Sequence, residues 1–242
     1  MTAHGSLKRS KDILLRVEKL FFPPVCLACN AQVDSIAQTL CENCRDMLVP
    51  ITEGFCTKCG GLLQDGKCDA CSTTEWYFDA ARSVYVYQTP VREMIHHLKY
   101  DFLLSPAAFL AKGMAALITW EDPGVSYDFI LPVPLHRVRE RGRGYNQSVL
   151  IARKLSALLG IPLAKMVSRK SNTRSQTNLS REARLKNLDG AFVMSGGTQI
   201  SGKRILLIDD VFTTGTTANE ISKLLKGNGA EKVFVLTAAR AV

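Results

Sequence analysis

Residues 204–217 read Arg-Ile-Leu-Leu-Ile-Asp-Asp-Val-Phe-Thr-Thr-Gly-Thr-Thr, and the order of these residues indicates the class of fold. The run from Ile205 to Ile208 is continuously apolar and β-branched at both ends, which is typical of a strand buried on both faces of a parallel sheet. Beyond the glycine, apolar residues recur at helical spacing: Ala218, Ile221, Leu224 and Leu225. The stretch therefore predicts a strand, an acidic edge, a glycine turn and a helix, as in an α/β fold.

The turn itself has the chemistry of a phosphate site. Its residues are small or carry a hydroxyl: Thr213, Thr214, Gly215, Thr216 and Thr217. The N-terminus of the following helix offers backbone N–H groups and a partial positive charge, which together hold a phosphate. The adjacent Asp209 and Asp210 can hold the vicinal hydroxyls of a sugar or a hydrated Mg²⁺. An ordinary strand-to-helix turn is the alternative, but the coincidence of apolar run, acid pair and hydroxyl turn favours a sugar-phosphate site.

The charge of the chain is concentrated in one segment. The 242 residues are 46% hydrophobic, enough for a buried core, and carry a formal net charge of +9. Residues 131–186 hold 13 Lys and Arg against two Asp and Glu, whereas the remainder holds 18 against 20. This segment therefore predicts an anionic partner such as pyrophosphate, a nucleotide or nucleic acid.

The first 22 residues do not read as a signal peptide, because lysines and arginines interrupt any apolar run. Residues 6–22 instead predict an amphipathic helix that Pro23-Pro24 ends, and packing is favoured over a membrane-surface role. No run approaches the length that spans a membrane. We therefore expect a cytoplasmic protein without membrane insertion, whose cysteines are not in disulfides.

All eight cysteines fall into four Cys-x₂-Cys knuckles between residues 26 and 71. They are Cys26, Cys29, Cys41, Cys44, Cys56, Cys59, Cys68 and Cys71. Two knuckles close one tetrahedral Zn²⁺ site, so the segment predicts two structural zinc sites. Spacing alone leaves the pairing open: consecutive knuckles can share a metal, or the first can pair with the third and the second with the fourth. A module this short and poor in apolar residues needs the metal to fold.

Periodicity and turn residues predict the remaining elements. Strands are expected over 80–87, 128–134, 162–167, 191–194 and 232–237, and helices over 90–98 and 106–118.

A basic stretch over 136–147 follows the 128–134 strand and precedes a helix. Its two glycines and four arginines predict a flexible, cationic loop: Arg137, Arg139, Arg141 and Arg143. Arginine forks bind phosphate bidentately. Three interpretations remain open: a pyrophosphate loop, a solvated basic loop, and a single-stranded nucleic-acid surface on which Tyr145 and the arginines stack with bases.

The quoted turn resembles the phosphoribosyl-pyrophosphate (PRPP) signature of type I phosphoribosyltransferases, and it lacks the Gly-Lys-Ser/Thr of a Walker A loop. Combined with the knuckles, Leu98-Lys-Tyr100, Pro132-Val-Pro-Leu and Arg141-Gly-Arg-Gly-Tyr-Asn-Gln147, it makes the chain resemble the ComF family from about residue 22 to 240. The resemblance implies a mainly parallel, Rossmann-like sheet. It also implies a double zinc ribbon over 23–75 and a phosphoribosyltransferase-like domain over 76–242, and the predicted N-terminal helix makes residues 1–22 a separate first part.

The resemblance assigns roles to the candidate residues. It implies Asp209, Asp210 and Arg141 as catalytic residues and the 213–217 turn as the site of the 5′-phosphate of Mg²⁺-bound PRPP. The polar segment 168–180 takes the place of a mobile loop, and a passive surface loop is the alternative. The residues expected to reach the pyrophosphate are Arg137, Arg143, Arg169, Lys170 and Arg174.

Two functions follow from the resemblance, which implies a bacterial protein that acts in natural competence and the use of imported DNA. The first is transfer of phosphoribosyl to an acceptor. The second is a PRPP-responsive adaptor, without turnover, that binds single-stranded DNA and a competence helicase. Transcription regulation ranks last, because no helix-turn-helix pattern is visible. With the chain ending at Val242, we expect any base pocket to come from residues 76–104, the polar segment or the zinc ribbons.

Overall fold

The fold is built on a parallel sheet whose central strand is the quoted stretch. A computed structural model describes the chain except for residues 1–22, 36, 122–123, 125, 171–189 and 196–198. The strands run in the order β1-β6-β5-β2, all parallel. Their bounds are β1 (Ala80–Val86), β2 (Phe129–Pro132), β5 (Arg204–Phe212) and β6 (Lys232–Arg240). The four strands carry their carboxyl ends to one edge of the sheet, where ligands bind in open α/β folds.

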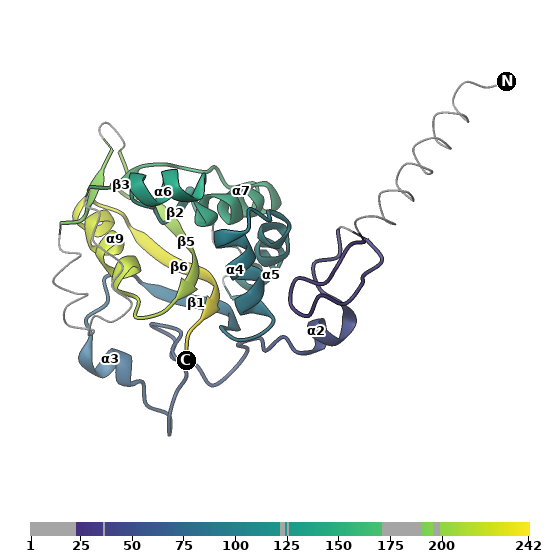
Figure 1. Cartoon of the computed structure of the whole chain (residues 1–242). Helices are drawn as coiled ribbons and strands as arrows, with labels where there is room; N and C mark the ends of the chain where they lie inside the picture. The colour runs from purple at the N-terminus through teal and green to yellow at the C-terminus, as the bar shows by residue number, and fades with distance from the viewer. Residues whose placement is uncertain (1–22, 36, 122–123, 125, 171–189, 196–198) are drawn as a thin grey trace.

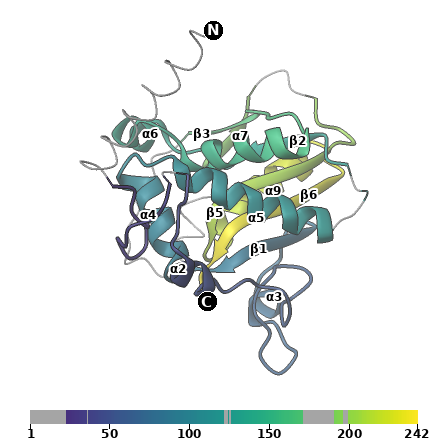
Figure 2. The same cartoon turned by 90° about the vertical axis from the view of Figure 1, so that its right-hand side faces the viewer.

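Helices cover both faces of the sheet, as Figure 1 and Figure 2 show. They are α4 (Val91–Tyr100), α5 (Ser105–Glu121), α7 (Gln147–Leu159) and α9 (Thr216–Gly227). Along β5, Leu206 and Ile208 share a buried cluster with α4, α5 and α7, whereas Ile205 and Leu207 share another with α9. Burial on both faces explains the unbroken apolar run of this strand.

The basic stretch is helical, so the prediction of a flexible loop over 136–147 is wrong. A short helix, α6 (Arg137–Arg143), begins where His136 Nδ1 accepts a hydrogen bond from the Val138 N–H at 3.3 Å. It ends at Gly144, whose φ of 74° lies in the left-handed region that glycine adopts at helix ends. Both caps offset the mutual repulsion of the arginines, of which Arg137 and Arg141 are exposed to water.

A two-stranded antiparallel sheet stands beside the main one, made of β3 (Val167–Arg169) and β4 (Phe192–Met194). The strand expected over 162–167 is therefore displaced, and Leu163 makes an isolated parallel bridge to Ile130 instead. The other predicted strands and helices agree with the structure to within a few residues. The expected helix over 6–22 and most of the polar segment, Arg174 included, lie outside the described residues.

The cysteine segment forms two small lobes with short helices, α2 (Glu42–Asp46) and α3 (Asp69–Thr73). Figure 1 shows these lobes on different sides of the sheet domain, α2 near α4 and α3 near the strand β1. Among the helices that the structure describes, none has both the length and the apolar character needed to cross a bilayer.

Candidate functional site

The phosphate-type turn lies at the carboxyl edge of the sheet, between β5 and α9. The strand continues beyond the predicted Ile208 to Phe212, so both aspartates belong to it. Gly215 precedes the helix with φ of 73°, and a Cβ there would lie 2.4 Å from Phe212 Cζ and 2.9 Å from Trp76 Cζ3. A side chain at this position would therefore be excluded both by conformation and by space.

The turn surrounds a small cavity of about 70 Å³. Its lining contains the five predicted phosphate residues, Thr213 to Thr217, together with Asp209. Thr214 Oγ1 and Thr216 Oγ1 lie 2.9 Å apart across the turn. Because the first N–H groups of a helix have no partner within the helix, this cavity combines hydroxyl and amide donors with one carboxylate.

Asp209 is held at the edge of this cavity by two hydrogen bonds. Its Oδ1 accepts from Ser148 Oγ at 2.8 Å and from the Asp210 backbone N–H at 2.9 Å. Burial and the nearby charge of Asp210 raise the pKa of Asp209 to about 7, against the lowering effect of the two hydrogen bonds and Lys99. The carboxyl can therefore exchange a proton near neutral pH, and a bound cation would favour its ionised form.

Asp210 faces a different partner, Lys99 of α4. Lys99 Nζ lies 2.5 Å from Asp210 Oδ2, and the Asp210 side chain is buried. Burial by itself would lower the pKa of Lys99, but attraction to Asp210 and Asp209 outweighs it and raises that pKa. Lys99 was not among the predicted site residues, although the sequence shows Lys99-Tyr100 beside the end of a predicted helix. Its role depends on a contact between residues 111 positions apart, which periodicity does not reveal.

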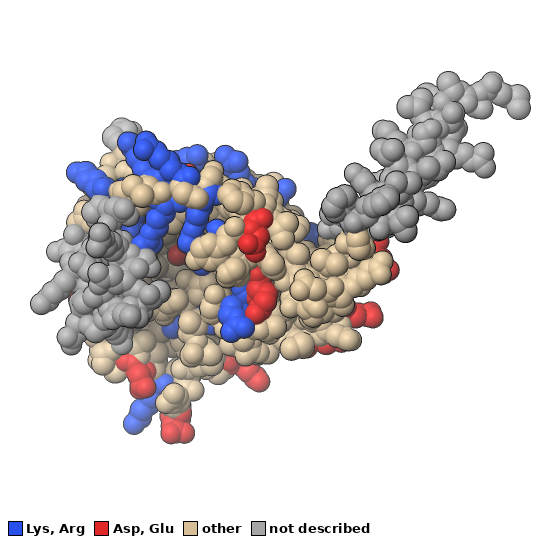
Figure 3. Space-filling view, viewed as in Figure 1, with Lys and Arg blue, Asp and Glu red and all other residues tan. Residues whose placement is uncertain are grey.

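A second cavity, of about 250 Å³, lies between the start of α6 and the strand β3. Arg137 and Arg169 both line it, so the structure brings one residue of the basic stretch together with one from the predicted mobile loop. Burial, followed by repulsion from Arg139, lowers the pKa of Arg169. Figure 3 shows the Lys and Arg side chains gathered over α6 and β3 on this side of the molecule. Glu140 also lines the cavity, but three basic side chains, Arg137, Lys165 and Arg169, outnumber it, and this excess suits a multiply charged anion.

The other predicted residues that the structure describes do not line either of these two cavities. Arg141 is exposed on α6, and Arg143 donates from Nη1 to Gln147 Oε1 at 3.3 Å. Lys170 is exposed and donates its backbone N–H to the Ala191 carbonyl. Tyr145 is half-buried, and its hydroxyl donates to the Leu98 carbonyl at 2.7 Å.

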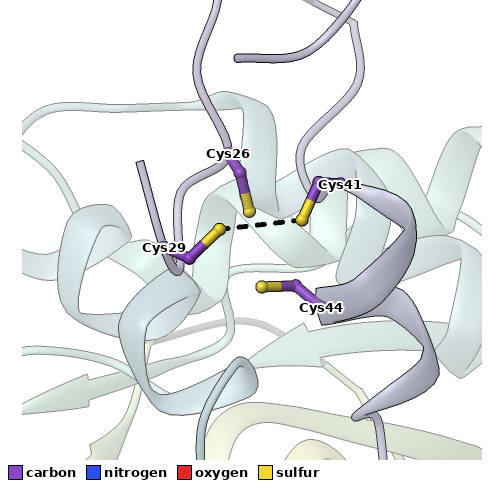
Figure 4. Close-up of side chains that lie close together, drawn as sticks. All are labelled: Cys26, Cys29, Cys41 and Cys44. Carbon is purple, nitrogen blue, oxygen red and sulfur yellow. Dashed lines mark hydrogen bonds between the residues drawn. The ribbon is translucent and has the colours of Figure 1, made fainter. Parts of the chain in front are cut away.

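The cysteines gather in two groups of four, each from consecutive knuckles. One group is Cys26, Cys29, Cys41 and Cys44, and the other is Cys56, Cys59, Cys68 and Cys71. Figure 4 shows the four sulfurs of the first group pointing toward one another. Of the two pairings that spacing leaves open, the structure therefore has the sequential one.

Both groups fit zinc. In each, the ligand atoms lie within 4.8 Å of one another, and adjacent sulfurs are separated by 3.6 Å for Cys29 and Cys41 and 3.4 Å for Cys59 and Cys68. Tetrahedral Zn–S bonds of about 2.3 Å require sulfurs about 3.8 Å apart. Burial opposes ionisation, yet backbone N–H groups of Cys41, Ala28 and Cys29 lower the pKa of Cys26 to about 6. Four sulfur ligands leave no open position, so these are structural sites.

Comparison with known families agrees with this architecture. The phosphoribosyl transferase domain family matches residues 146–241, and the double zinc ribbon domain family matches residues 17–72. The first match contains β5, the turn and α9, and the second contains all eight cysteines.

Relatives span nearly the whole chain. Competence protein F of Haemophilus influenzae is 32% identical over 230 residues, which cover 91% of this chain and 99% of that protein. The DNA utilization protein YhgH of Escherichia coli K12 is 31% identical, covering 87% of this chain and 88% of its own. Competence protein ComFC of Streptococcus pneumoniae is 28% identical, with coverages of 83% and 87%.

Solved structures that resemble the chain are more distant. The glutamine PRPP amidotransferase from B. subtilis has a TM-score of 0.39 and 19% identity, covering 58% of this chain and 30% of that one. Adenine phosphoribosyltransferase from Saccharomyces cerevisiae has a TM-score of 0.36 and 16% identity, covering 56% and 68%. From its relatives and its two domain matches, the chain belongs to the ComF family, with a type I phosphoribosyltransferase fold that follows a double zinc ribbon.

Proposed function

We propose that this chain binds PRPP with Mg²⁺ at the carboxyl edge of its sheet and transfers the phosphoribosyl group to an acceptor. The observation that carries the proposal is the cavity at the N-terminus of α9, which Asp209 and the turn Thr213–Thr217 line together. Hydroxyl and amide donors suit the 5′-phosphate, and the carboxylate at the same cavity suits the ribose hydroxyls.

The donor set fits a hard cation as well. Asp209 offers the carboxylate oxygen that Mg²⁺ prefers, and Mg²⁺ would neutralise charge on the departing pyrophosphate. Asp209 would bind in its ionised form. The Asp210 carboxylate lies 2.5 Å from the Lys99 ammonium. We therefore assign Asp210 the role of holding Lys99 at the edge of the site.

The basic residues would stabilise the leaving group. In the transfer, the bond between ribose C1 and the pyrophosphate oxygen breaks, the acceptor nitrogen bonds to C1, and the acceptor loses a proton. The ribosyl centre becomes cation-like, so catalysis is mainly positioning and electrostatic stabilisation. Arg137, Arg141, Arg143 and Arg169 would neutralise the pyrophosphate, with Lys170 and Arg174 joining when the polar segment closes.

The relatives named for competence and DNA utilization favour a role in processing imported DNA inside a bacterium. We place the protein in the cytoplasm on the same grounds. The three-part division into residues 1–22, 23–75 and 76–242 is proposed with it.

The test is calorimetric titration with PRPP and Mg²⁺, followed by a pyrophosphate-release assay with the common nucleobases. We expect binding in the wild type and its loss in Asp209→Asn combined with Asp210→Asn. Asp46→Asn removes a carboxylate from the exposed end of α2 and is the matched control. Binding of PRPP with no pyrophosphate release on any acceptor would reject transfer, and no binding would reject the site.

A second function is favoured by the four arginines of α6, which form a cationic helix beside the site. In this alternative the protein is a PRPP-responsive adaptor that binds single-stranded DNA and a competence helicase, without turnover. DNA affinity should then fall steeply with salt, and fall again in the triple variant Arg139→Ala, Arg141→Ala, Arg143→Ala. Arg153→Ala, at an exposed position of α7, is the control. An unchanged DNA affinity in the triple variant removes α6 from the DNA site.

A further inference from the structure

The segment between α4 and α5 exposes an unusual amount of apolar surface next to the candidate site. Tyr100 is 55% exposed, Phe102 64% and Leu104 53%, and Leu103 between them is also exposed. A contiguous exposed apolar patch marks an interaction surface. We call the four residues Tyr100, Phe102, Leu103 and Leu104 the aromatic platform.

The platform is held in place rather than loose. Phe102 has a φ of 57°, in the left-handed region that bulky residues rarely adopt. Its ring meets the Tyr145 ring edge-on, with centroids 5.7 Å apart, and lies so close to Gly144 that a Cβ there would be 3.2 Å from Phe102 Cε1. An unfavourable backbone conformation that keeps an aromatic ring in water is a cost that suggests a function.

Tyr100 is flanked by two planar groups. The His96 ring lies 4.7 Å away, and the Arg143 guanidinium carbon lies 5.0 Å from the Tyr100 ring centroid. Arg143 Nη2 donates to the Tyr100 hydroxyl at 3.4 Å, while Nη1 donates to Gln147 Oε1. The guanidinium is therefore fixed beside an exposed aromatic ring, which is an arrangement that stacks with nucleobases.

The platform also joins the candidate site to the cationic helix. Lys99, the residue before Tyr100, reaches Asp210, and Arg143 is the last residue of α6. Exposed Arg137 and Arg141 on that helix provide positive charge for phosphates. Tyr145, in contrast, has its hydroxyl bonded to the Leu98 carbonyl and its ring against Phe102, so Tyr100 and Phe102 offer the more open faces.

We propose that the aromatic platform stacks with unpaired bases of a single-stranded nucleic acid whose phosphates lie along α6. The inference rests on the nucleic-acid part of the proposed function and is independent of PRPP turnover. Aromatic faces next to a cationic groove are the means by which proteins hold single strands, and they tolerate any base sequence. Charge complementarity favours a polyanion here over a protein helix that would cover the apolar side chains.

The experiment is fluorescence anisotropy of a labelled oligothymidylate with the full chain, over a range of salt concentrations. Tyr100→Ala should weaken binding by roughly 5- to 100-fold per lost stacking contact. The slope of affinity against salt should stay unchanged, because no charge is removed, whereas Arg141→Ala should reduce that slope by about 1. Tyr100→Trp should restore the affinity, and Leu158→Ala, an exposed apolar residue on α7, should leave it unchanged.

Inorganic polyphosphate serves as the probe without bases. If Tyr100→Ala weakened polyphosphate binding as much as oligothymidylate binding, the tyrosine would act by orienting Arg143, and stacking would be rejected. Wild-type affinity for oligothymidylate in Tyr100→Ala would reject the proposal that the aromatic platform stacks with bases, and would favour a protein partner for this surface. Absence of oligonucleotide binding in the wild type would instead reject the nucleic-acid function itself, which separates the two failures.

Discussion

The two zinc ribbons have the same ligand pattern but rest on different parts of the domain. In the first, Cys26 and Cys44 share a buried cluster with the helices α4, α5 and α7. In the second, Cys59 shares a cluster with Trp76, Phe78 and Phe212, on the α9 side of the sheet. Equivalent motifs in the sequence thus contact different layers, and the second lies behind the phosphate-type turn.

The contact between the second ribbon and the turn runs through Arg240, near the end of β6. Its Nη1 donates to the Cys59 carbonyl at 2.8 Å, and its guanidinium lies 4.4 Å from the Phe212 ring centroid. Phe212 is in turn the residue against which a side chain at Gly215 would collide. A further hydrogen bond joins α9 to the segment that follows the second ribbon, because Asn219 Oδ1 accepts from the Tyr77 N–H at 2.7 Å. Zinc in the second ribbon should therefore support the turn, and zinc in the first should not.

The largest expected effect comes from removing one zinc at a time. Cys59→Ser should abolish the second site and weaken PRPP binding at least about tenfold, because the turn loses its support. Cys44→Ser should abolish the first site and change PRPP affinity by less than about threefold. Zinc content by mass spectrometry and PRPP titration check both. Equal losses of PRPP affinity would show that the ribbons are equivalent.

Gly215→Ala tests the contact between the turn and the second ribbon from the side of the turn. The added Cβ meets Phe212 and Trp76 in a left-handed backbone, which should cost about 2–4 kcal/mol of stability and weaken PRPP binding. Phe212 and Trp76 pack in the same cluster as Cys59, so the strain should disturb the second ribbon. A chelator should therefore remove zinc faster from the second site, with no change at the first. Gly227→Ala, at the other end of α9, has open space and should be neutral or slightly stabilising.

Arg240→Met tests the connection itself. The buried Cys59 carbonyl loses its donor, which should cost about 1–3 kcal/mol by thermal denaturation, with a weaker second zinc site. Arg204→Met removes an exposed pair with Glu231 and should cost no more than about 1 kcal/mol. Similar melting temperatures for the two variants would show that Arg240 does not link the second ribbon to the turn.

Proton binding at Asp209 gives a prediction about the pH dependence of stability. Because its folded pKa of about 7 lies above the reference value of 3.8, the folded protein binds more protons, so this group lowers stability as pH rises between about 4 and 7. Asp209→Asn should flatten that decline. Asp128, whose pKa is lowered chiefly by the Arg204 N–H, has the opposite sign, and its stabilisation is lost as pH falls below about 4.

The pKa of Asp209, measured by carboxyl NMR in the two zinc-site variants, tests whether either ribbon controls the cavity. The pKa of Asp209 should stay near 7 in Cys44→Ser and fall in Cys59→Ser, because water would enter the cavity that the turn and Asp209 share. An unchanged pKa in both variants would show that the second ribbon does not control the cavity.

Elements that depend on neighbouring residues could be predicted from the sequence. The strand, turn and helix around Gly215 are readable because burial, conformation and hydroxyl chemistry coincide within a few positions. The four knuckles likewise predict zinc, because the two cysteines of each knuckle lie within four positions. The helix α6 was missed, since four arginines and two glycines argue against a helix, while its His136 cap and Gly144 end were not recognised.

Contacts between distant residues could not be predicted, because they form only when the sheet and the helices pack together. The sequential pairing of knuckles follows from where the chain places the sulfurs, and spacing allowed another choice. Lys99 reaches Asp210, and Arg240 reaches Cys59 across 181 positions. A buried cation has to find a partner, but the sequence does not state which acceptor the packing of sheet and helices will bring to it. Which ribbon supports the turn is therefore a property of the fold and not of either motif.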